Sequence, residues 1–312
     1  MNDTFRLTLA QLNATVGDLS GNAEKAFAAW EAGKAASSDM VALPEMFVSG
    51  YSTQDLVMKP AFYKAAMAEI EALAKRTSDG PMLGIGGPFF ENGRLYNAYF
   101  ICKSGQVVAH QLKHFLPNYD VFDEVRQFRR GQISGPYDAG PLRIGSPICE
   151  DSWYVDVAEA MVESGAELLL VPNGSPYYRG KFDKRVGTMV SRVVENDVPL
   201  VYLNQVGGQD DQVFDGGSFV LNRGGKLAVQ LPVFEECIAH VTFNRTEDGG
   251  WAAEEGRKEN YPPLVEQDYH AMVLSLRDYL AKTGFSKVLL GLSGGIDSAL
   301  VATIAVDGQA LS

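Results

Sequence analysis

Hydrophobic and polar positions alternate along the first 245 residues in a way that predicts both strands and helices. Residues 5–12 alternate apolar and polar side chains, which is typical of a strand with one buried face. Residues 61–76 instead carry apolar side chains at helical spacing. Because the two patterns take turns along the chain, we expect a mixed sheet of α/β class. Further strands are expected at 40–43, 81–86, 141–144, 168–171, 200–204 and 236–243, hairpins at 95–113 and 218–230, and further helices at 22–36, 154–164 and 182–196.

The pattern changes after residue 245. Residues 246–267 are polar and acidic and contain two consecutive prolines, which predicts a linker. Residues 268–312 then give an amphipathic helix, a strand at 287–290, a glycine-rich turn and the start of another helix. A parallel strand needs a partner returned by a crossover, and none follows here. We therefore expect a first domain at 1–245, a linker at 246–267 and an incomplete start of a second domain at 268–312.

Composition and charge exclude several classes. The 312 residues are 46% hydrophobic, enough for a large core, and 39 acidic residues outweigh 27 basic ones, for a formal charge of −12. Without a basic stripe, nucleic-acid binding is disfavoured. Apolar runs are strand-sized, and the N-terminus has no signal pattern, so no membrane association is expected. Three cysteines without CxxC spacing and four scattered histidines favour reduced thiols in a cytoplasm and no metal site.

Three expected strand ends carry side chains that could act together. They are Glu45 after residues 40–43, Lys113 at the end of the first hairpin, and Cys149 where a strand passes into a helix. A thiol, a carboxylate and an ammonium suffice for acyl transfer from an amide: the thiol attacks, the carboxylate moves the proton, and the ammonium supports the oxyanion. Each residue also has a simpler interpretation: a buried structural thiol, a helix-start acid and a solvated lysine.

The segments around these residues resemble a known family. LPEM at 43–46, KHFLP at 113–117 and ICEDSW at 148–153 are similar in order and spacing to the Glu–Lys–Cys triad segments of the nitrilase, or carbon–nitrogen hydrolase, superfamily. The resemblance covers roughly residues 5–245. It implies an αββα four-layer sandwich, a homo-oligomer, catalysis by Glu45, Lys113 and Cys149, and no cofactor for this domain.

The C-terminal part resembles a second family. SGGIDS at 293–298, after an expected strand, is similar to the pyrophosphate-binding loop of ATP-pyrophosphatases, in which backbone N–H groups meet phosphate. Joined to the first domain, it resembles glutamine-dependent NAD⁺ synthetases. That resemblance implies a Rossmann-like synthetase domain, present here only as a stub, that uses ATP and Mg²⁺ to amidate nicotinic acid adenine dinucleotide with ammonia from glutamine. It also implies ATP contacts from Ser293, Gly294, Gly295, Asp297 and Ser298.

The same resemblance implies a substrate-binding shell. Tyr119 would border the glutamine, and Glu124 would steady the lysine and the attacking water; a solvated loop is the alternative for both. Ser175 and a basic residue shortly after it would hold the α-carboxylate and α-amino groups of glutamine. Lys181 fits the basic role by spacing, with Arg179 as the alternative.

Two other functions stay open at this point. A free-standing amidase, carbamoylase or nitrilase would use the same triad, because these enzymes differ only in the pocket. It would, however, have no reason to carry residues 293–298. A non-catalytic binding or oligomerisation module would retain the pattern with an unreactive Cys149.

Overall fold

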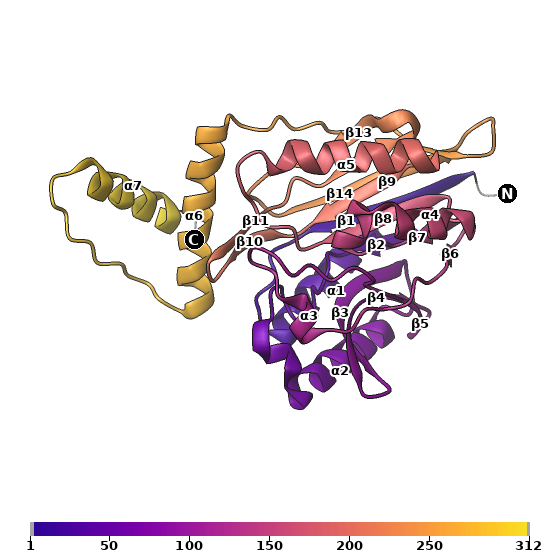
Figure 1. The fold of residues 1–312 in the computed structure, drawn as a ribbon, viewed down its shortest axis with the longest axis horizontal. Helices are drawn as coiled ribbons and strands as arrows, with labels where there is room; N and C mark the ends of the chain where they lie inside the picture. Colours follow the sequence, from indigo (N-terminus) through magenta and orange to yellow (C-terminus); the bar gives the residue numbers. More distant parts are fainter. Residues whose placement is uncertain (1–2, 311–312) are drawn as a thin grey trace.

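The computed structural model describes residues 3–310, and its core is a pair of stacked sheets (Figure 1). Residues 311 and 312, the end of the expected second domain, lie outside the described residues. The first sheet has seven strands in the order β15 (Trp251–Ala253), β14 (Cys237–Arg245), β1 (Thr4–Gln11), β2 (Met40–Ala42), β3 (Met82–Glu91), β4 (Arg94–Lys103) and β5 (Gln106–Leu112). The second has six, in the order β13 (Lys226–Gln230), β12 (Phe219–Asn222), β9 (Leu200–Asn204), β8 (Leu168–Asn173), β7 (Leu142–Gly145) and β6 (Tyr137–Ala139).

Both sheets are mixed, as the alternation of elements predicts. Strands β1, β2 and β3 pair in parallel, and so do β7, β8 and β9, whereas the hairpin strands pair antiparallel. The carboxyl ends of the parallel strands therefore lie along one edge of each sheet. The expected hairpins are confirmed as β4–β5 and β12–β13.

Apolar packing joins four layers. One buried cluster combines side chains from both sheets, including Leu7 and Ile101 of the first and Leu170 and Val220 of the second. Another lies between the first sheet and helices α1 (Leu19–Ala35) and α2 (Pro60–Arg76). A third lies between the second sheet and helices α4 (Val155–Glu163) and α5 (Lys181–Asn196). The expected αββα sandwich is thus confirmed.

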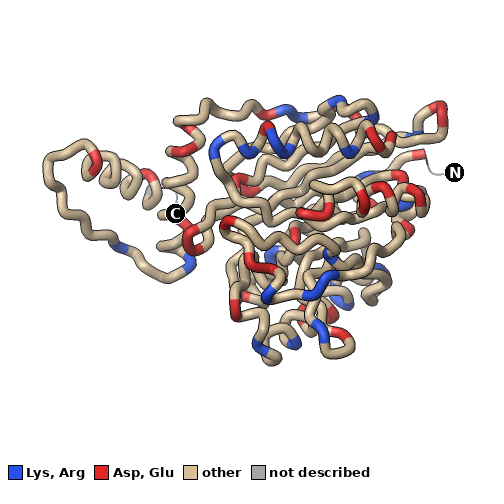
Figure 2. The backbone as a smooth tube through the Cα atoms, viewed as in Figure 1, with Lys and Arg blue, Asp and Glu red and all other residues tan. Residues whose placement is uncertain are grey.

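Shorter elements connect these layers. They are the helix α3 (Glu124–Gln127), the 3₁₀ turns η1 (Gln54–Met58), η2 (Cys149–Trp153) and η3 (Arg223–Gly225), and a separate hairpin of β10 (Val206–Gln209) and β11 (Gln212–Asp215). The sequence analysis missed the β10–β11 hairpin and β6. Figure 2 shows basic and acidic residues interspersed over the backbone. No helix within residues 3–310 is long and apolar enough to cross a membrane.

The segment predicted as a linker contains regular structure. Strand β15 lies inside it and extends the first sheet, with Trp251 fully buried. Helix α6 (Leu264–Thr283) begins before the expected boundary and packs on β10. Where the boundary between the two domains falls stays a prediction.

The part after α6 differs from the prediction in one element. Helix α7 (Ile296–Ala310) forms and contacts α6, standing away from the sheets (Figure 1). Residues 287–290, expected as a buried strand, are irregular instead, and Leu289 is fully exposed. The strand prediction is wrong because a strand forms only against a partner, and the described residues supply none there.

Candidate active site

The ends of β2 and β5 bring two predicted residues into direct contact. Lys113 follows β5, Glu45 lies three residues after β2, and the Lys113 Nζ is 2.7 Å from Glu45 Oε1. Glu124, at the start of α3, contacts the same ammonium: the Lys113 Nζ is 3.0 Å from Glu124 Oε1 and 2.9 Å from Glu124 Oε2. All three side chains are buried. The lysine thus lies between two carboxylates.

Electrostatics keep this lysine charged. Burial by itself would lower the pKa of Lys113, but the combined attraction of Glu124 and Glu45 outweighs it and raises that pKa well above its usual value. Burial raises the pKa of Glu124, and the Lys113 charge opposes that rise. The fold therefore supplies a permanent cation in a closed site.

Two polar residues that the sequence analysis missed complete this cluster. Asn97 of β4 donates through Nδ2 to Glu45 Oε1 at 2.7 Å and to Glu124 Oε1 at 3.3 Å. Tyr51 donates through its hydroxyl to Glu124 Oε1 at 2.9 Å. A polar residue on a strand of the first hairpin is a signal that could have found Asn97. Tyr51 lies outside the named elements and offers no such signal.

Close backbone packing fixes Glu45. The Gly174 N–H, just after β8, donates to Glu45 Oε2 at 2.7 Å, so the second sheet holds the carboxylate that follows the first. On the other side, a Cβ at Gly86 of β3 would lie 2.1 Å from Met46 N. Only glycine allows the strand to approach the Glu45 turn this closely.

Cys149 opens η2 directly after the β7 loop, where the sequence predicts a strand-to-helix junction. Its φ is 47°, a left-handed conformation that is rare outside glycine and is concentrated at functional sites. The thiol is buried, which is the main reason that its pKa lies well above the usual value. The charge of Glu45 raises this pKa further, and that of Lys113 lowers it, so both groups act on the sulfur. The three predicted triad residues therefore share one electrostatic environment.

Asp151 ties the cysteine turn to the lysine strand. Its Oδ2 accepts from Ile148 N at 3.0 Å, and its Oδ1 accepts from His114 N at 2.9 Å and Phe115 N at 2.7 Å. Burial raises its pKa to about 7, against the three backbone donors that lower it. No role was predicted for this residue, which sets the spacing between the segments that carry Lys113 and Cys149.

The predicted substrate residues surround this centre at different depths. Tyr119 is 46% exposed and donates to Glu150 Oε2 at 2.8 Å. Ser175 is buried, and its N–H donates to Asn204 Oδ1 at 2.9 Å.

The two basic candidates have different surroundings. The Lys181 Nζ lies over the Trp153 ring, 5.1 Å from its centroid, beside the cysteine turn. Arg179 points to α6 instead, where its Nε donates to Asp268 Oδ2 at 2.6 Å. This arrangement supports Lys181 over Arg179 as the predicted substrate ligand.

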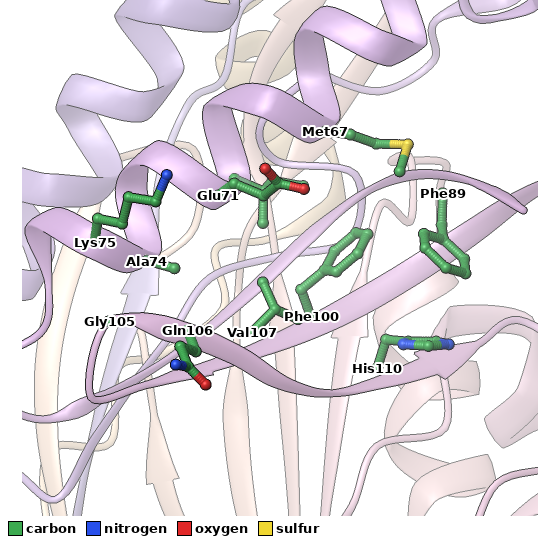
Figure 3. A pocket seen from close by; sticks show the side chains of 11 residues that line it. Met67, Glu71, Ala74, Lys75, Phe89, Phe100, Gly105, Gln106, Val107 and His110 are labelled. Atoms are coloured by element: carbon green, nitrogen blue, oxygen red, sulfur yellow. The ribbon is translucent and has the colours of Figure 1, made fainter.

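Two cavities lie near the fold's edges. One of about 480 Å³ is lined by Asp120, Pro176 and Lys181 among others, residues that belong to or adjoin the predicted substrate shell. The other, of about 370 Å³, lies between α2 and strands β3–β5, where Met67, Phe89, Phe100 and His110 form an apolar lining (Figure 3). None of the predicted site residues lines this second cavity, whereas Lys181 lines the first.

The predicted ATP-binding residues are not brought to the triad. Residues 293–298 lie in the exposed loop before α7 and at its first turn. Gly294 has a left-handed φ of 85°, and Ser293 Oγ lies 3.1 Å from Ser298 Oγ. Across residues 3–310, no group of three or more His, Cys, Asp and Glu side chains could hold a metal ion.

Comparison with known sequences agrees with this geometry. The pattern of the carbon–nitrogen hydrolase family matches residues 6–249. The chain belongs to the carbon–nitrogen hydrolase family. The pattern of the NAD synthase family matches residues 268–310 of the same chain. Both resemblances expected from the sequence are confirmed, in the expected order.

The chain is also similar to longer proteins. It is 59% identical to the glutamine-dependent NAD(+) synthetase of Rhodobacter capsulatus, over 98% of this chain and 55% of that protein. It is 39% identical to the one of Aquifex aeolicus, over 97% of this chain and 58% of that protein. The chain therefore spans a little over half the length of these relatives.

Solved structures show the same fold. The glutamine-dependent NAD+ synthetase of Acinetobacter baumannii, in complex with ADP, superimposes with a TM-score of 0.92 at 35% identity, over 98% of this chain and 57% of that one. An amidase from Nesterenkonia sp. AN1 superimposes with a TM-score of 0.67 at 23% identity, over 76% of this chain and 92% of that one. The second likeness shows the shared fold alone.

Proposed function

We propose that residues 1–245 hydrolyse the side-chain amide of glutamine through a thioester on Cys149, and that the ammonia serves ATP-dependent amidation of nicotinic acid adenine dinucleotide in a longer protein. The observation that carries the proposal is the buried Lys113 ammonium between Glu45 and Glu124, in the electrostatic field of the Cys149 thiol. The similarity to glutamine-dependent NAD(+) synthetases supports glutamine as the substrate.

The proposed chemistry needs only these side chains. The Cys149 sulfur bonds to the amide carbon while Glu45 takes the thiol proton, and the Lys113 ammonium stabilises the oxyanion. The C–N bond then breaks as Glu45 returns the proton to nitrogen, which leaves as ammonia. Water then attacks the thioester carbon while Glu45 takes a proton from it. The C–S bond breaks as Glu45 returns that proton to the sulfur, which releases glutamate and restores the thiol.

Glu124 has a distinct place in this scheme. Its Oε2 is buried and has no hydrogen-bond partner among the described residues, although it lies 2.9 Å from the lysine nitrogen. A buried carboxylate oxygen that is held only by an ion pair can accept a further hydrogen bond from the substrate amide or the attacking water. We propose that Tyr119, Ser175 and Lys181 complete the pocket around the glutamine.

The C-terminal loop supports the second half of the proposal. In residues 293–298, the left-handed Gly294 lies two residues before a helix of 15 residues, whose first N–H groups are where a phosphate would bind. We propose that Ser293, Gly294, Gly295, Asp297 and Ser298 contact the phosphates of ATP, with Mg²⁺ bound by residues outside this chain. We also propose a cytoplasmic homo-oligomer, which sedimentation analysis of the purified protein would test.

The test is direct. The purified chain should release equal amounts of glutamate and ammonia from glutamine, and Cys149→Ala should lower the rate at least about a thousandfold. Cys237→Ala, which removes a half-buried thiol at the start of β14, is the matched control and should keep the rate. A preference for acetamide or simple nitriles over glutamine would favour the free-standing amidase alternative. No turnover of any amide, with an unreactive Cys149, would favour the non-catalytic alternative.

A further inference from the structure

The loop of residues 174–180 connects β8 to α5 and carries much of the proposed substrate pocket. Its Gly174 N–H fixes Glu45, Ser175 is buried, and Lys181 begins the helix that follows. Any movement of this loop would therefore shift the substrate contacts and the carboxylate together. What holds the loop decides how well the pocket is formed before the substrate arrives.

One support of the loop comes from helix α5. Arg185 of α5 donates through Nη2 to Ser175 O at 2.7 Å and to Pro176 O at 3.1 Å. The same guanidinium forms a buried two-contact ion pair with Asp215, at 2.8 Å to each oxygen. Tyr261, from the stretch between β15 and α6, donates its hydroxyl to Asp215 Oδ2 at 3.2 Å. Its ring stacks on Phe182 of α5 with centroids 3.6 Å apart.

A second support reaches the loop from outside. Asp268, in the second turn of α6, accepts from the Tyr177 hydroxyl at 2.7 Å and from Arg179 Nε at 2.6 Å. Helix α6 is in turn fixed to the hydrolase fold, because Asp278 accepts from Asn13 Nδ2 at 2.6 Å and from Gly208 N at 2.7 Å. Asp268 thus holds the loop directly, and Tyr261 holds it through Asp215 and Arg185. Both Tyr261 and Asp268 lie after the last strand of the sheets.

We propose that Tyr261 and Asp268 are positioning residues that hold the loop of residues 174–180 in its substrate-binding conformation. They would set the affinity of the site for the amide without changing the reactivity of Cys149. This inference rests on the proposed function for its substrate. It makes the segment that leads into the NAD synthase part a physical contact between that part and the amide site.

The test compares Tyr261→Phe, Asp268→Ala and the double variant with the parent chain. Tyr269→Phe is the matched control, since it also removes a tyrosine hydroxyl after the last strand, but this one lies in α6 and donates to Asp307 of α7 at 2.5 Å. Tyr261→Phe and Asp268→Ala should each raise KM for glutamine roughly threefold to tenfold, the range for one lost hydrogen bond. The double variant should raise KM further. The value of kcat and the rate of Cys149 alkylation by iodoacetamide should stay within about twofold of the parent.

Hydrogen–deuterium exchange gives a readout that does not depend on turnover. The backbone amides of residues 174–180 should exchange faster in the double variant than in the parent chain. In Tyr269→Phe their exchange rates should equal those of the parent. An unchanged KM in the double variant, or an equal KM rise in the control, overturns the inference. Lack of glutamine turnover by the parent refutes the proposed function instead, and unchanged exchange in the loop would then still overturn the positioning role.

Discussion

Replacing Lys113 with methionine should destabilise the protein strongly, because it removes the cation between two buried carboxylates. The Nζ lies 2.7 Å from Glu45 and 2.9 Å from Glu124. At an effective dielectric of about 20, each contact is a gross attraction of about 6 kcal/mol, most of which offsets the desolvation of the charges. Removing one member of such a buried group costs about 3–5 kcal/mol, since it leaves charge without compensation.

The loss should depend on pH in a fixed direction. Without the cation, burial and the neighbouring Glu45 hold the pKa of Glu124 above that of glutamate in the unfolded chain, about 4.3. Between those values the folded variant binds more protons than the unfolded one, so its free energy of unfolding rises as the pH falls. The difference from the parent should therefore be largest near pH 7.5 and smaller at pH 5. Burial raises the pKa of Asp151 to about 7 and the Lys113 charge lowers it, so loss of the cation raises this pKa too and shifts stability in the same direction.

Urea unfolding at the two pH values measures these differences. Adding Glu124→Gln to Lys113→Met removes one of the two uncompensated charges and should recover a large share of the loss at pH 7.5. Lys34→Met is the control, because its ion pair with Asp79 is exposed and should contribute less than about 1 kcal/mol. Equal destabilisation by Lys113→Met at both pH values, or further loss in the double variant, would refute the charged cluster.

Three more predictions concern other parts of the fold. Gly86→Ala should lower the free energy of unfolding by about 1–3 kcal/mol and lower activity, since its Cβ would clash with Met46 N. Gly187→Ala, in open space within α5, should raise the free energy of unfolding by about 0.5–1 kcal/mol. Thermal unfolding that ranks the two variants in reverse would contradict this reasoning. Burial lowers the pKa of Lys282 to about 8, below its unfolded value of about 10.4, so stability should rise with pH across that window and lose this dependence in Lys282→Met, as urea titrations would show. The alkylation rate of Cys149 by iodoacetamide should climb with pH without a plateau up to pH 9, because burial raises the thiol pKa; a plateau near neutrality would contradict a neutral thiol.

The strand ends explain why much of the site could be predicted. Glu45, Lys113 and Cys149 each follow a short apolar run, so local periodicity places them at sheet edges. Their meeting depends on two sheets stacking face to face, which local periodicity does not encode. The family resemblance supplied that step, and the contact between Lys113 and Glu45 at 2.7 Å agrees with it.

The remaining contacts could not be predicted because they depend on long-range approach of irregular segments. Tyr51 and Glu124 are 73 positions apart, and the Gly174 N–H meets Glu45 across 129 positions. For residues 287–290 the local pattern was present and the prediction was still wrong. Their pattern is that of a buried strand, but burial needs a partner strand that the described chain does not provide. Local propensity therefore identified the segment and misjudged its state.

Charge in the buried cluster limits how the thiol can react. The side chains of Glu45, Lys113 and Glu124 share one buried cluster, with the ammonium within 2.9 Å of both carboxyl groups. A thiolate on Cys149 would place negative charge in the same closed space, and burial together with the charge of Glu45 raises the pKa of the thiol. Passing the thiol proton to Glu45 keeps the charge of these four groups constant, and the negative charge then develops on the substrate oxygen. The proposed proton transfer and carbon–sulfur bond formation should therefore occur together, with the lysine stabilising the oxyanion.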